Sequence, residues 1–185
     1  MEVLKLKVLI LTDVEKNHSI FHKKYLELLE RLKGNDVLTF DVRENKVLSC
    51  LSCYRCWVEH PGVCHIKDDF DKFTNSFYSS DMFIIFTKIY FGCYSSAIKR
   101  YMERLIINML PFFEERDGKM YHAKRYSKVP QYIMIGYSEM LTQFEKTTFC
   151  SAVKKNTINL KQNTYKAIVL DKENTYIESG VVCER

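Results

Sequence analysis

The most apolar stretch of the chain is Met82-Phe83-Ile84-Ile85-Phe86, which lies between Asp81 and Thr87. A short, continuous apolar run is typical of a strand that is buried on both faces, as the strands of a parallel sheet are. A helical pattern follows from Ser95 to Leu110, with its apolar residues on one side, and Pro111 ends it. A buried strand followed by an amphipathic helix is the repeating unit of an α/β protein.

The same alternation extends in both directions along the chain. Strands are predicted at 4–11, 36–42, 81–87, 132–135 and 165–170. Helices are predicted from Ile20 to Gly34, after Asp68-Asp69, from Ser95 to Leu110, and after Gly136 through Val153. A carboxylate of Asp68-Asp69 is expected to cap the second of these helices. A long loop is expected after Pro111.

This pattern predicts an α/β fold built as one domain over residues 1–185. Five strands joined by helices fit a doubly wound, flavodoxin-like parallel sheet of order 2-1-3-4-5, with helices on both faces as three α/β/α layers. Ligands of such sheets bind beyond the carboxyl ends of the strands. We therefore expect a site at the loops that start at Thr12, Thr87 and Gly136.

The composition excludes several classes of protein. The chain is 46% hydrophobic and 28% charged, with only 6 Gly and 3 Pro, which is unlike collagen-like, low-complexity or disordered chains. No apolar run approaches the ~20 residues needed to cross a bilayer, and the N-terminus is unlike a signal peptide. The net charge is only +5 and the basic residues are scattered, so we expect a cytoplasmic protein without nucleic-acid or membrane partners.

Seven cysteines are the unusual feature, and four of them form Cys50-x2-Cys53-x2-Cys56-x7-Cys64. In a reducing cytosol such a cluster indicates a metal or redox site rather than a disulfide framework. The three-residue spacing lets successive thiolates approach one centre, and four soft thiolates select an iron–sulfur cluster or zinc. The spacing leaves three readings open: a 4Fe–4S cluster, structural zinc, or unligated thiols that pack as small hydrophobes.

Taken together, these segments resemble the NADPH-dependent FMN reductases, and among them most closely the iron–sulfur flavoproteins. The resemblance runs from about Lys5 to Gly136. The motifs that carry it are the cysteine loop, Asp68-Asp69, the apolar strand at 81–87, Thr87-x-x-Tyr90-Phe91-Gly92, Ser95-Ser96 and Lys99-x4-Arg104. It implies the flavodoxin-like fold, a non-covalent FMN, and NAD(P)H as a possible co-substrate.

The resemblance also implies which residues form the site. The four cysteines of the loop would hold a 4Fe–4S cluster. The loop after the third strand would wrap the flavin ring, and the first loop matches the family's pattern only at Asn17 and Ser19. The implied flavin-contacting residues are Asn17, Ser19, Thr87, Lys88, Ile89, Tyr90, Phe91, Gly92 and Gly136.

Two positions depart from the family's pattern. Lys88 stands where the family usually has proline, and a cation there would stabilise a reduced, anionic flavin or else point to solvent. The first loop lacks the family's glycines, and its Asp13 adds negative charge. One carboxylate ~5 Å from a phosphate charge costs about 3 kcal/mol at an effective dielectric near 20, against ~12 kcal/mol for nanomolar binding. An outward-turned Asp13 would remove most of that penalty.

The expected function is that of an FMN-dependent oxidoreductase or electron-transfer flavoprotein. Its partners would be a small-molecule redox substrate or a ferredoxin-like electron partner, and a homodimer or homotetramer contact would use Tyr94, Tyr101 or Phe112-Phe113. One alternative is a binding protein that has lost FMN and holds structural zinc or free thiols. Another is a thiol-based redox sensor that uses Cys53 and Cys56.

Overall fold

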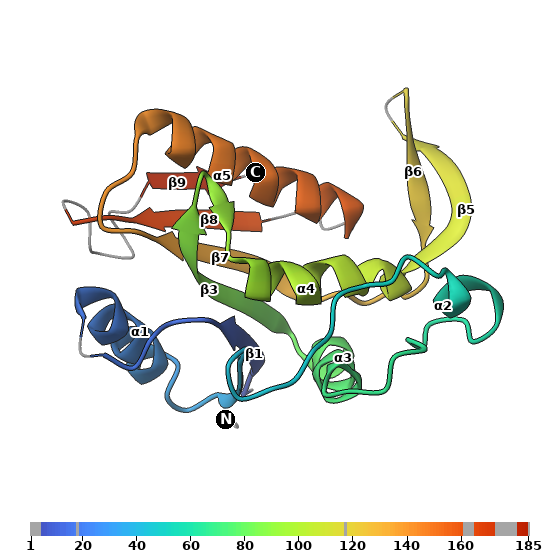
Figure 1. Ribbon diagram of the computed structural model, residues 1–185, viewed down its shortest axis with the longest axis horizontal. Coiled ribbons are helices and arrows are strands. Elements are labelled where there is room, and N and C mark those ends of the chain that lie inside the picture. The colour runs from blue at the N-terminus through green and yellow to red at the C-terminus, as the bar shows by residue number, and fades with distance from the viewer. Residues whose placement is uncertain (1–4, 18, 117, 161–164, 173–180, 185) are drawn as a thin grey trace.

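A computed structural model describes residues 5–17, 19–116, 118–160, 165–172 and 181–184, and for 181–184 it describes the backbone alone. A central sheet runs through the molecule (Figure 1). In spatial order its strands are β2 (Asp36–Asp41), β1 (Lys7–Thr12), β3 (Met82–Tyr90), β7 (Gln131–Tyr137), β8 (Tyr165–Leu170) and β9 (Val181–Glu184). The first five are parallel, and β9 runs antiparallel to β8.

The predicted flavodoxin-like fold and its strand order are therefore confirmed. The five predicted strands are β2, β1, β3, β7 and β8, in the expected arrangement. The structure adds β9 at one edge and a short strand, β4 (Cys93–Tyr94), which pairs antiparallel with β3. The prediction for the first strand began at Leu4, which lies outside the described residues.

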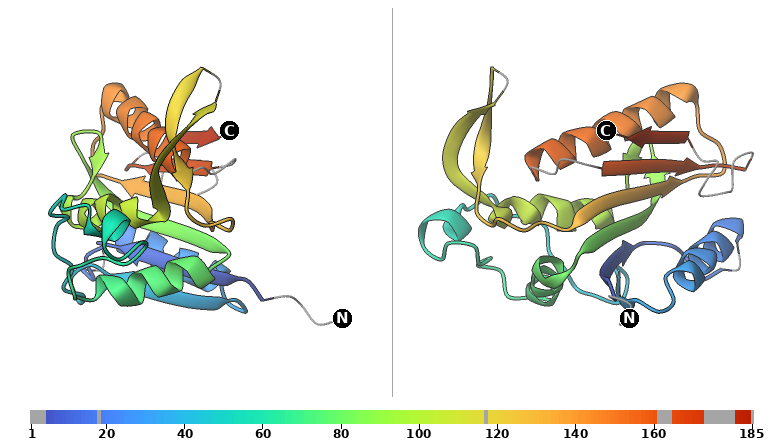
Figure 2. Two further views of the ribbon diagram at one scale, coloured as in Figure 1. Left: turned by 90° about the vertical axis from the view of Figure 1, so that its right-hand side faces the viewer. Right: turned by 180° about the vertical axis from the view of Figure 1, so that it is seen from behind.

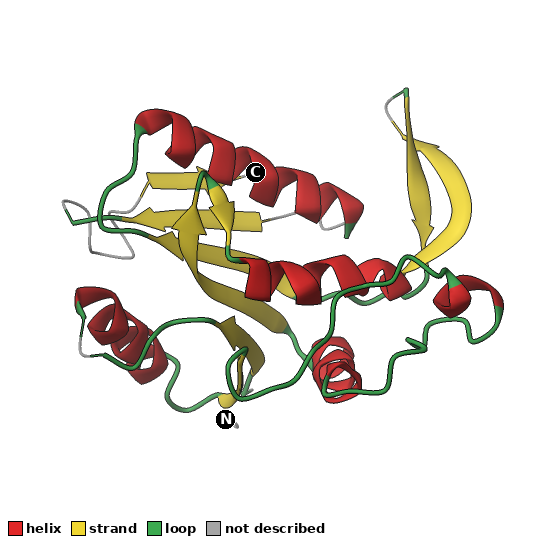
Figure 3. Cartoon of the chain, viewed as in Figure 1, coloured by secondary structure: helices red, strands yellow, loops and turns green. Residues whose placement is uncertain are grey.

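Helices cover both faces of the sheet (Figures 2 and 3). One face packs against α1 (Ile20–Arg31), and the other packs against α3 (Phe70–Ser79), α4 (Ser96–Arg104) and α5 (Gln143–Asn159). Side chains of β1 alternate between the two cores: Leu9 faces the three-helix side, and Val8 and Ile10 face α1. Burial on both faces explains why these strands are continuous apolar runs.

The region after α4 differs from the prediction of a helix to Leu110 and a long loop. The α-helix ends at Arg104, and a 3-10 turn, η1 (Leu105–Asn108), follows it. The chain then forms a hairpin of β5 (Met109–Arg116) and β6 (Lys119–Lys124), which stands apart from the central sheet in Figure 1. Pro111 cannot continue a helix, but it is accepted where the hairpin has a bulge between Met109 and Phe113.

A carboxylate does bind the start of α3, as predicted, and it is that of Asp68. Asp69 occupies the N-cap position, but its side chain makes no capping hydrogen bond. Asp68 instead accepts a hydrogen bond from the Phe70 amide at 3.0 Å, and its second oxygen accepts from Arg104. The residue before the cap thus fixes the start of the helix.

Within the part of the chain that the structure describes, no helix is both long and apolar enough to span a bilayer.

Candidate functional site

Two neighbouring cavities open at the carboxyl ends of β1, β3 and β7, where the fold predicts a ligand site. The larger cavity holds about 480 Å³, which is within the range of small-molecule sites. The smaller cavity holds about 80 Å³. Glu15, Lys88 and Tyr137 line both. The larger cavity is also lined by Asp13, Val42, Arg43, Tyr90, Phe91, Ser95, Ser96 and Ala97, and the smaller by Asn17, Ser19, Phe21, Ser138 and Glu139.

Asp13 fastens the first loop to the end of β3. Its carboxylate accepts hydrogen bonds from the Thr87 hydroxyl at 2.8 Å and from the Lys88 amide at 3.0 Å. Burial raises the pKa of the Asp13 carboxyl, and hydrogen bonds from Ser95, Thr87 and Lys88 oppose that rise. Asp13 therefore does not turn outward to solvent. It faces the larger cavity, while Asn17 and Ser19 line the smaller one.

The raised pKa predicts how Asp13 affects stability. The folded protein keeps the Asp13 proton to higher pH than the unfolded chain does. The contribution of Asp13 to the free energy of unfolding is therefore most favourable below the ordinary pKa of 3.8. It is lost as pH rises through the raised pKa of the folded state. The quantity to follow is the difference between the free energies of unfolding of the wild type and of Asp13→Asn. We expect this difference, wild type minus variant, to decrease as pH rises through this window. Urea titrations between about pH 3 and pH 8 measure it. A difference that increases with pH would contradict the assignment.

The first loop is ordered by side chains in place of glycines. The Ser19 hydroxyl caps α1 by accepting from the His22 amide at 3.2 Å, and the Asn17 side chain accepts from the Ser19 amide at 3.1 Å. Glu15 in turn accepts from the Asn17 side-chain amide at 3.0 Å. These bonds place the start of α1, with its favourable electrostatics for anions, against the smaller cavity.

The segment after β3 is a tight hairpin turn, and not an open loop that wraps a ring. Tyr90 pairs with Cys93, which leaves Phe91 and Gly92 as the two turn residues, at φ of 50° and 73°. Two successive positive φ angles are those of a type I′ turn. Tyr90 and Phe91 still line the larger cavity, and Phe91 is 94% exposed.

The remaining predicted flavin-contacting residues line neither cavity. Thr87 is fully buried, and its hydroxyl bonds Asp13. Ile89 is buried in the core, and Gly136 lies against it: a side chain at Gly136 would meet Ile89 and Phe149 within 3 Å. The side chains of Thr87 and Ile89 are used in packing and hydrogen bonding beneath the cavity, and flavin contact by these residues stays a prediction. Sequence reasoning missed Arg43 and Tyr137, although both follow or end strands at this edge.

Gly92 allows the turn to pack closely on α5. A Cβ at Gly92 would lie 2.8 Å from Thr148 Cβ and 3.2 Å from the Glu145 carbonyl oxygen, at a φ that disfavours any side chain. We expect Gly92→Ala to lower the free energy of unfolding by about 3 kcal/mol. Gly34→Ala is the matched control, because Gly34 has φ +93 with nothing within 4 Å, and only about 1 kcal/mol is expected there. Equal losses in urea titrations would show that packing at Gly92 is unimportant.

The four cysteines of the loop line a third cavity, of about 50 Å³. Cys56 is buried, Cys50 and Cys64 are half-buried, and Cys53 is exposed. Burial, and then the neighbouring Cys64, Cys50 and Cys53, raise the pKa of the Cys56 thiol, which reflects how near the four sulfur atoms are. The structure therefore brings the four side chains to one cavity, as the spacing predicted, but it does not bring their sulfur atoms to a single centre.

The loop backbone is shaped around these sulfur atoms. The Ser52 amide donates a hydrogen bond to Cys50 Sγ at 3.4 Å. Ser52 and Tyr54 both adopt left-handed conformations, at φ of 50° and 55°, which is unusual for residues with side chains. Such backbone strain persists only where the surroundings impose it, and it is concentrated at functional sites.

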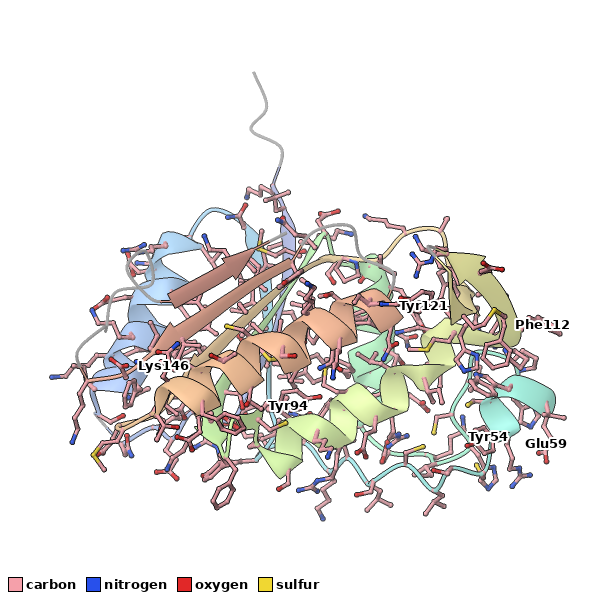
Figure 4. The ribbon with its side chains drawn as sticks, turned by 90° about the horizontal axis from the view of Figure 1, so that it is seen from above. Tyr54, Glu59, Tyr94, Phe112, Tyr121 and Lys146 are labelled. Atoms are coloured by element: carbon pink, nitrogen blue, oxygen red, sulfur yellow. The ribbon has the colours of Figure 1, made fainter. Side chains whose placement is uncertain are left out.

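Contacts from α4, η1 and the hairpin hold the cysteine loop in place. Arg104 donates to the carbonyls of Leu48 and Ile66, just before and just after the cysteines. Trp57, in α2 (Arg55–Val58), donates to the Ile106 carbonyl, and its ring is tilted against the His122 ring of β6 with 5.0 Å between the ring centroids. Figure 4 shows Tyr54 and Glu59 of this loop at the same end of the molecule as Phe112 and Tyr121 of the hairpin.

No set of three or more His, Cys, Asp or Glu side chains in the described part of the chain is placed to hold a single metal ion. The four thiols share a cavity wall without meeting at one ion-sized point. Among the described residues, this arrangement shows no preformed site for a zinc ion or for an iron ion.

The fold is flavodoxin-like, with two cavities at the carboxyl ends of its strands. Residues 6–133 match the model of the family described as NADPH-dependent FMN reductase. The chain belongs to that family, which makes it an FMN-dependent oxidoreductase and confirms the predicted resemblance at the level of the family. No curated protein sequence is significantly similar to it.

Solved structures with the same fold include several reductases. An azoreductase from Bacillus anthracis aligns with a TM-score of 0.66 at 11% identity, over 94% of this chain and 90% of that chain. An NAD(P)H:quinone oxidoreductase from Methanothermobacter marburgensis aligns at 0.64 and 10% identity, over 91% and 85%. An FMN-dependent NADH-azoreductase from Bacillus anthracis, in complex with FMN, aligns at 0.60 and 13% identity, over 92% and 89%. At these identities the likeness is one of fold.

Proposed function

We propose that the chain is an NAD(P)H-dependent flavoprotein that binds FMN at the two edge cavities and a 4Fe–4S cluster in the cysteine loop. The observation that carries the cluster assignment is that all four thiols of Cys50, Cys53, Cys56 and Cys64 line one cavity. When bound, the flavin would accept two electrons as hydride and the cluster would exchange electrons singly.

The position and the hydrogen-bonding groups of the edge cavities support FMN binding. The smaller cavity would take the phosphate, beside the start of α1 and the hydroxyls of Ser19 and Ser138. The larger cavity would take the flavin ring, between Tyr90 and Tyr137. Lys88 borders both cavities and would offset the negative charges of Asp13 and Glu15.

The cysteine cavity fits a cluster by its donor set. Four soft thiols and a backbone amide directed at one sulfur are the groups that bind and tune iron–sulfur clusters. Helix α4 connects the two sites: Ala97 near its start lines the larger cavity, and Arg104 at its end lines the cysteine cavity. At 1.5 Å per residue these positions are on the order of 10 Å apart along the helix.

The surface supports the further proposal that copies of the chain associate as a homodimer or homotetramer. Phe112 and Phe113 of β5 are 69% and 61% exposed, and large exposed aromatics commonly mark contact surfaces. A small-molecule redox substrate or a ferredoxin-like protein would be the electron partner, in the cytoplasm.

Anaerobic titration with NADPH and NADH tests the proposed activity. The FMN-loaded protein is mixed with each nucleotide, and the flavin absorption is followed. We expect the flavin band to bleach with about one equivalent of nucleotide, since one hydride carries two electrons. A bound flavin that neither nucleotide reduces would contradict the proposed activity.

A further inference from the structure

Arg104 is the buried charged residue in the wall of the cysteine cavity. Its side chain is 0% exposed, and it lines the cavity together with the four cysteines. The guanidinium lies 4.2 Å over the Phe70 ring, donates to the carbonyls of Leu48 and Ile66, and pairs with Asp68 at 2.6 Å. Its Nε is buried and has no hydrogen-bond partner among the described residues.

An unpartnered donor is unusual in a side chain this deeply buried. A buried donor without an acceptor costs free energy, and most such groups in folded proteins are satisfied. The other guanidinium nitrogens are used to close the base of the cysteine loop. The guanidinium therefore places a fixed positive charge in the wall of the cysteine cavity.

Asp68 compensates part of this positive charge. Burial opposes ionisation, but the hydrogen bond from Arg104 and the amides of Leu48 and Phe70 hold the pKa of the Asp68 carboxyl below its usual value. The cavity wall thus contains a fixed cation with a fixed anion directly behind it. Changing either member alone changes the net charge beside the cysteines by one unit, in opposite directions.

We propose that Arg104 is a positioning residue for the cluster: it fixes both ends of the cysteine loop, and its buried positive charge favours the reduced state of the cluster. This inference rests on the proposed cluster. Four thiolates make a 4Fe–4S centre anionic, and reduction adds one more negative charge. A nearby cation stabilises the reduced form more than the oxidised form, because the attraction grows with the charge of the centre.

The test is a redox titration of the reconstituted chain and of three variants. Arg104→Gln removes the cation, Asp68→Asn removes the anion with little change in shape, and Arg104→Lys keeps the charge while losing the forked hydrogen bonds. We expect Arg104→Gln to lower the equilibrium constant for one-electron reduction of the cluster about tenfold. This corresponds to a reduction potential that is lower by about 59 mV. We expect Asp68→Asn to raise this equilibrium constant by a similar factor and Arg104→Lys to stay within about threefold.

A merely structural role predicts a different pattern. All three variants weaken the loop and lower the urea midpoint, so a structural effect moves the cluster potential in one direction or leaves it unchanged. Either result, in variants that retain iron, overturns the inference. Where Arg104→Gln does not assemble, Asp68→Asn decides alone, and an unchanged or lowered potential overturns it. Failure of the wild type itself to take up iron would instead refute the proposed cluster.

Discussion

Replacing Cys56 with serine is expected to lower the iron content of the reconstituted protein to less than about a tenth of the wild-type value. Cys56 is the buried member of the four, and the other three thiols surround it. A serine at this position preserves the shape of the cavity but removes the soft thiolate that iron–sulfur clusters need. Iron and acid-labile sulfide assays, with the visible absorption spectrum, measure the effect.

Cys93→Ser is the matched control for this experiment. Cys93 is also a free, half-buried cysteine, but it lies in β4, outside the cysteine cavity. It is expected to leave the iron content unchanged. Equal iron contents in Cys56→Ser and the wild type would show that the four-cysteine cavity does not hold the cluster. Equal losses of iron in Cys56→Ser and Cys93→Ser would show the same.

Replacing Lys88 with methionine is expected to weaken FMN binding about 10- to 100-fold. Lys88 borders both edge cavities, and its amide is fixed by Asp13 at the end of β3. A charge-assisted hydrogen bond contributes about 1.5–3 kcal/mol, and each 1.4 kcal/mol is a factor of ten in the dissociation constant. Without this cation, Asp13 and Glu15 would face the bound flavin nucleotide with less compensation.

Two controls separate this effect from a general loss of charge. Lys88→Arg keeps the cation and is expected to bind FMN within a few-fold of the wild type. Lys72→Met removes an exposed lysine that pairs with Asp69 and lines neither cavity, so FMN binding should be unchanged. Titration of the apoprotein with FMN, followed by flavin fluorescence, gives the dissociation constants. Unchanged binding in Lys88→Met would place the flavin elsewhere.

The sequence was sufficient for the central sheet because its strands are buried on both faces. Short apolar runs such as Met82-Phe83-Ile84-Ile85-Phe86, rich in β-branched and aromatic residues, are typical of strands buried on both faces. The hairpin of β5 and β6 was missed for the opposite reason. Its strands are half-exposed and mixed in charge, and Pro111 indicates a helix end equally well. One contact that positions the hairpin is between the His122 and Trp57 rings, which are far apart in sequence, so no local pattern reveals it.

The candidate sites were predictable to different degrees. The spacing of the cysteines predicted that their thiols would approach one another, since the whole set lies within one short loop. The side-chain hydrogen bonds that organise each site join residues that are far apart in sequence. Thr87 bonds Asp13 across 74 positions, and Arg104 bonds Asp68 across 36. These contacts exist only once the sheet and α4 are formed, so they could not be predicted from spacing.

The most direct test is the cofactor content of protein reconstituted anaerobically with FMN, iron and sulfide, then freed of unbound reagents. The account predicts about one FMN, four iron and four sulfide per chain. One zinc with no iron, or a protein that retains no flavin, would contradict it.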